Sequence, residues 1–143
     1  MEIVPFSEEN VFVLSELMKY DVAERKGTAV PMRKLMKAIR DGVIRFVFLK
    51  EGETAVGFAG FSALFDYAVF SNVLEIGYLY LLPQMRGKGY GKKVIRYLEK
   101  LARASDAEYL LYRGNAVLRA AQFRFTKRAD GSFVRKVVKE EEL

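Results

Sequence analysis

The first 42 residues combine one short apolar stretch with two helical patterns. Residues 1–5 predict a strand. Ser7 and the two glutamates after it predict a helix start, because acids are favourable at the positive end of a helix dipole. The apolar stripe of this helix consists of Val11, Leu14, Leu17 and Met18. A second helix is predicted to begin at Pro31 and to end at Gly42. Its apolar side consists of Met32, Leu35, Met36 and Ile39.

The middle of the chain predicts three consecutive strands. Large apolar residues alternate over residues 44–48, and Gly52 then marks a turn. Residues 55–65 alternate small and large side chains, and residues 73–82 form an apolar run that Pro83 is expected to end. We therefore expect a three-strand meander here.

The remainder alternates between helical and strand patterns. The predicted elements are a loop over 84–91, a helix over 91–104, a strand over 109–112, a helix over 116–127 and a strand over 133–138. The complete order, β-α-α-β-β-β-α-β-α-β, predicts an α+β fold with a mixed, mainly antiparallel central sheet and helices on both faces. The length of 143 residues suits a single domain over residues 1–143.

Composition excludes several classes of chemistry. The chain has no cysteine and no histidine, so disulfides, thiolate or imidazole metal sites, cysteine nucleophiles and serine-histidine hydrolases are not expected. We therefore expect no metal site. No apolar run reaches the roughly 18 residues that a membrane span needs, and the N-terminus does not have the pattern of a signal peptide. These features predict a cytoplasmic protein with no membrane partner.

Charge is distributed unevenly along the chain. Residues 1–83 carry 9 basic and 11 acidic side chains, whereas residues 84–136 carry 14 basic and 4 acidic ones. A basic block of this kind favours a polyanionic partner, either a phosphorylated cofactor or a nucleic acid. A solvated helix face is the alternative interpretation.

The most informative segment is a glycine-rich loop between a predicted strand and a predicted helix. It reads Arg-Gly-Lys-Gly-Tyr-Gly from Arg86 to Gly91. Glycines allow backbone N–H groups to approach an anion closely, and the helix that follows adds unpaired N–H groups and its dipole. The segment therefore predicts a pyrophosphate site, with a flexible loop and helix cap as the alternative.

Two common phosphate-binding motifs do not fit this loop. A P-loop needs glycine at position 86 and serine or threonine at position 93, where the chain has arginine and lysine. The dinucleotide fingerprint needs a different glycine spacing and a βαβ unit at its start. The spacing that fits is Arg-x-x-Gly-x-Gly, from Arg86 through Gly89 to Gly91.

Leu-Tyr-Leu-Leu-Pro at 79–83, followed by this loop, resembles the GNAT superfamily of coenzyme A-dependent N-acetyltransferases. The resemblance covers the element order of the chain and is motif-level over residues 73–115. It implies a GNAT-like fold in which backbone N–H groups of the loop hold the pyrophosphate of acetyl-CoA and the strand backbone pairs with the pantetheine arm. The implied cofactor-binding residues are Leu79, Leu81, Arg86, Gly87, Lys88, Gly89, Tyr90, Gly91, Lys92 and Asn115.

Two further positions take their interpretation from this resemblance. Gly77 would accommodate a bulge that separates two neighbouring strands, although a simple packing glycine is the alternative. Asn115 would bond the pantetheine arm or cap the following helix, and a cap alone is the alternative.

Glu75 is the candidate catalytic residue. It is the one charged residue in an apolar strand, eleven positions before Arg86. The resemblance implies a base that takes a proton from the attacking amine at this spacing; a structural ion pair is the alternative.

The tyrosine that family members often use as the acid is replaced here by Gln122. Strand alternation is expected to place Tyr78 and Tyr80 on the opposite face from Glu75.

The resemblance implies an N-acetyltransferase that moves an acetyl group from acetyl-CoA to an amine by direct transfer in a ternary complex. The amine is that of a protein N-terminus, a lysine or a small molecule, and a backbone N–H near Leu79 would stabilise the oxyanion. A non-catalytic, CoA-binding regulatory protein is the first alternative. A basic nucleic-acid-binding module is less favoured, because most aromatics in 84–136 fall at core-like positions. Whether the chain forms a homodimer is left open.

Overall fold

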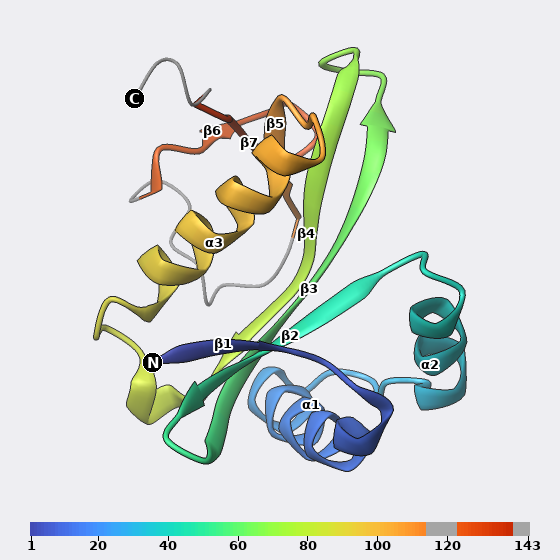
Figure 1. The fold of residues 1–143 in the computed structure, drawn as a ribbon, viewed down its shortest axis with the longest axis vertical. Helices are drawn as coiled ribbons and strands as arrows, with labels where there is room; N and C mark the ends of the chain where they lie inside the picture. Colours follow the sequence, from blue (N-terminus) through green and yellow to red (C-terminus); the bar gives the residue numbers. More distant parts are fainter. Residues whose placement is uncertain (114–122, 139–143) are drawn as a thin grey trace.

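A mixed β-sheet separates two helical layers in the computed structural model, which describes residues 1–113 and 123–138 (Figure 1). In these residues the strand order is β1-β2-β3-β4-β5-β7-β6. The strands are β1 (Glu2–Pro5), β2 (Arg45–Glu51), β3 (Thr54–Asp66), β4 (Ser71–Leu81), β5 (Tyr109–Tyr112), β6 (Thr126–Lys127) and β7 (Phe133–Lys136). The helices are α1 (Val11–Arg25), α2 (Met32–Arg40) and α3 (Tyr90–Ala104), with short 3-10 turns η1 (Glu8–Asn10) and η2 (Pro83–Met85).

The sheet is antiparallel except at its centre. Strands β1 to β4 pair antiparallel in chain order, and β5, β7 and β6 pair antiparallel beyond them. Strands β4 and β5 are parallel, so the chain must cross over between them, and α3 makes this crossover. The expected mixed, mainly antiparallel α+β fold is confirmed.

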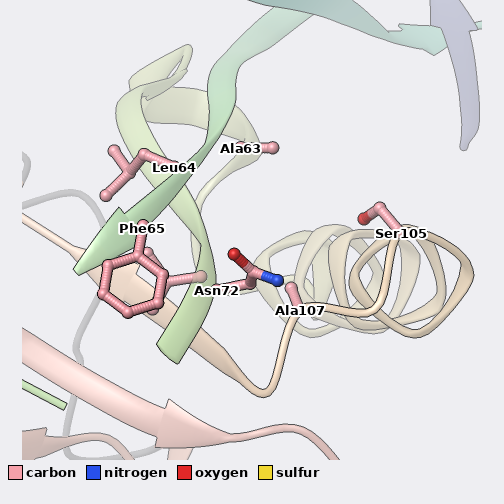
Figure 2. A pocket seen from close by; sticks show the side chains of 7 residues that line it. Ala63, Leu64, Phe65, Asn72, Ser105 and Ala107 are labelled. Atoms are coloured by element: carbon pink, nitrogen blue, oxygen red, sulfur yellow. The ribbon is translucent and has the colours of Figure 1, made fainter. Parts of the chain in front are cut away.

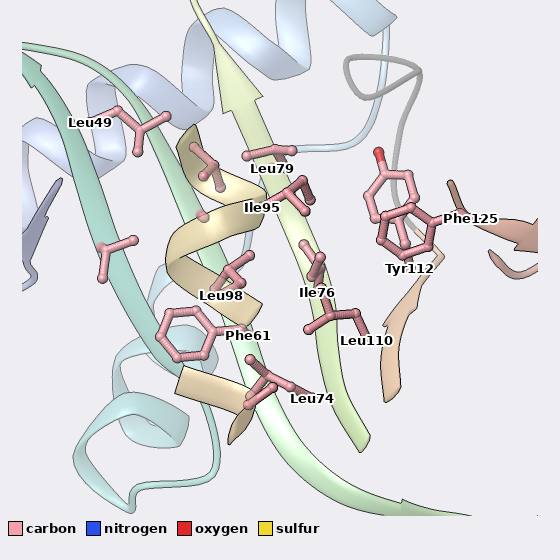
Figure 3. Packing of buried hydrophobic residues seen from close by; sticks show 14 of the residues in the cluster. Leu49, Phe61, Leu74, Ile76, Leu79, Ile95, Leu98, Leu110, Tyr112 and Phe125 are labelled. Carbon is pink, nitrogen blue, oxygen red and sulfur yellow. The ribbon is translucent and has the colours of Figure 1, made fainter. Parts of the chain in front are cut away.

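Each face of the sheet has its own hydrophobic core. On one face, Leu14, Leu17 and Met18 of the predicted α1 stripe pack against the aromatic side chains of β2 and β3. On the other face, Ile95 and Leu98 of α3 pack against β4 and β5 (Figure 3). The helices therefore lie where their apolar stripes predict. Within the described residues, every helix is too short or too polar to span a bilayer.

One predicted element is wrong in its described part. The apolar period over 116–127 predicts a helix, but Thr126 and Lys127 form β6 and pair with β7. Phe125, just before them, is buried in the core beside Tyr112. At the end of the segment, pairing with β7 and the burial of Phe125 therefore outweigh the helix that the apolar spacing predicts. Residues 114–122 lie outside the described part of the chain.

A β-bulge at Gly77 divides β4 into two halves. Phe61 of β3 pairs with Ile76, and the preceding Gly60 pairs with Tyr78, so Gly77 is an extra residue in β4. The pairing of β4 with β5 ends at Ile76 and Tyr112, immediately before the bulge. The bulge expected at Gly77 is therefore present, and it lies where the two strands separate.

The bulge also changes which side chains share a face. Before it, Leu74 and Ile76 face α3; after it, Leu79 and Leu81 do so. Tyr78 and Tyr80 consequently lie on the α1 face, with Glu75. The expectation that alternation separates these tyrosines from Glu75 is wrong, because it assumes a strand without an extra residue.

Candidate active site

The glycine loop joins β4 to α3 and requires glycine for its backbone. Gly87 and Gly89 have φ angles of 78° and 85°, a left-handed conformation that is strained for other residues. Gly89 is the residue immediately before α3. A Cβ atom at either position would meet nothing within 4 Å. Among residues 1–113 and 123–138 the space in front of these two glycines is therefore open, and the glycines serve backbone shape rather than packing.

Unpaired backbone donors gather at the end of this loop. The first N–H groups of a helix have no acceptor within it, and Tyr90, Gly91 and Lys92 occupy the first turn of α3. Among the described residues, the first backbone hydrogen bond into this turn runs from Lys93 N–H to Gly89, at 3.4 Å. Together with the helix dipole and the exposed Lys88 and Lys92, these donors suit an anion.

Beyond the bulge, no strand of the described residues pairs with the second edge of β4, which is called the open edge below. The N–H of Leu82 donates to Val56 of β3 at 2.8 Å, so the backbone groups of Leu79 and Leu81 point away from β3. They face the side of β4 on which β5 pairs only as far as Ile76. An extended chain with amide groups could pair with this edge as an added strand.

Arg86 has its side chain engaged within the protein. Its guanidinium donates to both carboxylate oxygens of Glu24, at 2.7 and 3.0 Å, and its Nε donates to the carbonyl of Leu81 at 2.9 Å. It also lies over the ring of Tyr80, 5.6 Å from its centroid. We expected Arg86 to bind the cofactor; the structure places its side chain at the base of the loop.

The last turns of α1 meet β4 through buried polar groups. The Tyr78 hydroxyl donates to the buried Asp21 carboxylate, which also accepts from Arg25 Nε at 2.8 Å. Burial and the Asp21 contact raise the pKa of Tyr78 to about 12. Burial and the nearby Glu24 carboxylate also raise the pKa of Tyr80. Both shifts favour the neutral form of the tyrosine.

Glu75 forms an ion pair. Its carboxylate lies 2.5 Å from the guanidinium of Arg113, and its side chain is 19% exposed. The structural ion pair that the sequence left open for this residue is therefore present. The residue lies on the α1 face of β4 and precedes the bulge, whereas Tyr78 follows it.

Tyr90 links the start of α3 to the end of β2. Its interaction with the Glu51 carboxylate lowers the pKa of Glu51 and raises that of Tyr90. Two other positions considered from the sequence, Asn115 and Gln122, lie outside the described residues.

Residues 1–113 and 123–138 contain no cluster of three or more histidine, cysteine or acidic side chains that could hold a metal ion.

A separate hollow of about 270 Å³ lies at the other end of β4 (Figure 2). It is lined by Ala63, Leu64, Phe65, Asn72, Val73, Ser105 and Ala107. Ser105 follows the C-terminus of α3, whereas the glycine loop precedes its N-terminus. The 15 residues of α3 span about 22 Å, so the hollow is not part of the loop site.

A family model described as the acetyltransferase (GNAT) family matches residues 12–126. The chain belongs to the GNAT acetyltransferase family. It is therefore an acyltransferase. No curated protein matches the chain in sequence.

Solved structures of GNAT proteins share the fold. A predicted acetyltransferase from Clostridium acetobutylicum, in a structure with acetyl-CoA, is 11% identical, with a TM-score of 0.75 and coverage of 90% of this chain and 92% of that one. A GNAT-family acetyltransferase from Staphylococcus aureus is 13% identical, with a TM-score of 0.72 and coverage of 96% and 99%. A ribosomal-protein-alanine N-acetyltransferase from Brucella melitensis is 16% identical, with a TM-score of 0.67 and coverage of 80% of each chain.

Sequence reasoning missed the acidic residues of α1 that contact Tyr78 and Arg86. Asp21 continues the apolar stripe of Leu17 and Met18 at helical spacing. An acid at a core-facing position usually marks a buried polar contact, so this signal could have identified it. Glu24 has no such signal, because its partner Arg86 is 62 residues away in the sequence.

The raised pKa of Tyr78 predicts a loss of stability at high pH. Its folded pKa is about 12 against an ordinary value of 10, so its contribution is complete below pH 10 and is lost as pH rises toward 12. Urea unfolding across this range should show a smaller loss for Tyr78→Phe than for wild type. The exposed Tyr20→Phe should behave as wild type, and equal losses in all three proteins would contradict the assignment.

Proposed function

We propose that the protein transfers an acetyl group from acetyl-CoA to a primary amine in a ternary complex. The observation that carries this proposal is the continuity of the site: the open edge of β4 beyond Gly77 leads directly into the glycine loop at the start of α3. The solved GNAT structure with acetyl-CoA supports the cofactor. The alanine N-acetyltransferase among the structural neighbours supports an amine acceptor.

Backbone groups do most of the binding in this proposal. The N–H groups from Gly87 to Lys92 hold the pyrophosphate, and the positive φ angles and open space at Gly87 and Gly89 fit that use. The N–H and C=O of Leu79 and the N–H of Leu81 pair with the amide groups of the pantetheine arm, while the Leu81 carbonyl accepts from Arg86 Nε. The N–H of Leu79 stabilises the negative charge that develops on the thioester oxygen.

The chemical step forms a nitrogen–carbon bond and breaks the carbon–sulfur bond. The amine nitrogen attacks the thioester carbonyl, the sulfur leaves as a thiolate, and the amine loses a proton to the Glu75 carboxylate, directly or through water. A thiol with a pKa of about 8.5 leaves near neutral pH without full protonation. Tyr78 is a poor acid for this step, because its hydroxyl already donates a hydrogen bond to Asp21 and its pKa is about 12.

The first test is binding of acetyl-CoA followed by release of free thiol. Acetyl-CoA should raise the melting temperature of the protein. A panel of amines, comprising peptide N-termini, lysine peptides and polyamines, should then include one that releases thiol from acetyl-CoA. Stabilisation without thiol release from any amine would favour the non-catalytic alternative, and no stabilisation would contradict the proposal.

The glycine loop gives a prediction for the cofactor site. Gly89→Val should abolish stabilisation by acetyl-CoA, because the side chain fills the open space and strains a backbone with a φ of 85°. Gly42→Val is a matched control, since Gly42 has a φ of 74° and is equally unobstructed. Each variant should lose roughly 1–2 kcal/mol of stability from backbone strain.

Thermal-shift titrations of the two variants separate strain from binding. Gly42→Val should retain the full shift with acetyl-CoA, whereas Gly89→Val should retain none. A folded Gly89→Val protein with an unchanged shift would remove the loop from the cofactor site.

Glu75 gives a prediction for the proton transfer. Glu75→Gln should retain acetyl-CoA affinity and lower turnover by about 10²-fold. The deficit should shrink as pH rises, because the acceptor amine then loses its proton without help. Since Glu75 is paired with Arg113, Arg113→Gln is the control that breaks the same ion pair and leaves the carboxylate in place.

pH–rate profiles and melting curves of both variants decide between the two roles of Glu75. A base predicts a large, pH-dependent rate loss for Glu75→Gln alone. A purely structural ion pair predicts similar melting-temperature losses in both variants, with equal rates across pH. The second result would leave water or the free-amine fraction of the substrate to supply the nucleophile.

A further inference from the structure

The last turn of α1 is bound directly to the start of the glycine loop. Both carboxylate oxygens of Glu24 accept hydrogen bonds from the two terminal nitrogens of Arg86, at 2.7 and 3.0 Å. This two-point contact uses the planar fork of the guanidinium and restricts its rotation as well as its position. Residues 62 positions apart in sequence are thereby held in one geometry.

Arg86 transmits this restraint to the backbone. Its Nε donates to the carbonyl of Leu81, the last residue of β4, at 2.9 Å, and its guanidinium lies over the Tyr80 ring. Gly87, with its left-handed backbone, is the next residue along the chain. One side chain therefore connects α1, the end of the open edge of β4 and the first residue of the loop.

We propose that Glu24 is a positioning residue for acetyl-CoA binding, acting through Arg86. The inference rests on the proposed binding of acetyl-CoA at this loop. Glu24 holds the Arg86 guanidinium in the orientation in which its Nε donates to the Leu81 carbonyl. This restraint fixes the direction in which the loop N–H groups point. Because the loop is already ordered before the cofactor binds, binding does not include the free-energy cost of ordering it.

The sign of the effect separates positioning from simple electrostatics. Glu24 brings a negative charge toward a loop that binds a polyanion, so by charge alone its removal should tighten binding. Its removal also frees the Arg86 guanidinium, which could then contact a phosphate and tighten binding further. Weaker binding after loss of Glu24 is therefore expected only if its hold on Arg86 orders the loop.

Calorimetric titration of acetyl-CoA into the full chain tests this proposal. Glu24→Gln keeps the size of the side chain and removes its charge, and it should weaken binding by roughly three- to tenfold. In turnover assays the KM for acetyl-CoA should rise while kcat stays unchanged. Glu16→Gln is the matched control, because Glu16 is an exposed acid on the same helix, paired with Lys19 at 3.3 Å.

A double variant checks that the effect passes through Arg86. Arg86→Gln should also weaken binding, and adding Glu24→Gln to it should produce no further loss. Additive losses would overturn the proposed route. The side chains of Arg86 and Glu24 are 30% and 39% exposed, so all of these variants are expected to fold.

The possible failures are distinguishable. Wild-type protein that does not bind acetyl-CoA would contradict the proposed function and this inference together. Wild-type protein that binds, with a Glu24→Gln variant that binds equally well or more tightly, would overturn the inference alone.

Discussion

The site depends on a single extra residue in the central strand. The pairing of β4 with β5 ends just before Gly77, so within residues 1–113 and 123–138 no strand pairs with the N–H and C=O of Leu79 or with the N–H of Leu81. Unpaired backbone groups are costly when they are buried away from water. An edge of this kind therefore favours a partner that supplies extended amide groups. The same bulge places Glu75, Tyr78 and Tyr80 together on the α1 face, so it determines which side chains border the proposed cofactor site.

The second constraint is the polar contact between α1 and this half of β4. Glu24 and Arg25 lie three and four residues after Asp21 on α1. Asp21 accepts from Tyr78 and Arg25, and Glu24 accepts from Arg86. A helix that packed only through its apolar stripe would tolerate small shifts along the sheet. These directional contacts restrict such shifts and connect the N-terminal helical layer to the glycine loop. The resulting arrangement suits an enzyme of the GNAT family, in which two substrates must meet in a defined orientation.

Periodicity predicted most of the fold because each helix and strand buries one continuous apolar face. The glycine loop was equally predictable, since its spacing has a local physical meaning at a strand-to-helix junction. Prediction failed where the outcome depended on distant partners. The faces of Tyr78 and Tyr80 follow from a bulge that alternation does not reveal, and β6 forms because Thr126 and Lys127 find β7. The contact of Glu24 depends on an arginine 62 residues away, and no local pattern encodes that distance.

Hydrogen exchange of backbone amides, measured with and without acetyl-CoA, tests most directly whether the edge beyond Gly77 and the glycine loop form one cofactor site. If they do, the amides of Leu79 and of Gly87 to Lys92 should exchange more slowly when acetyl-CoA is present, because the pantetheine arm and pyrophosphate accept their hydrogen bonds. Amides in residues 63–65 and 105–107, beside the separate hollow, should be unaffected. Protection confined to that hollow, or absent from both Leu79 and the loop, would contradict the account.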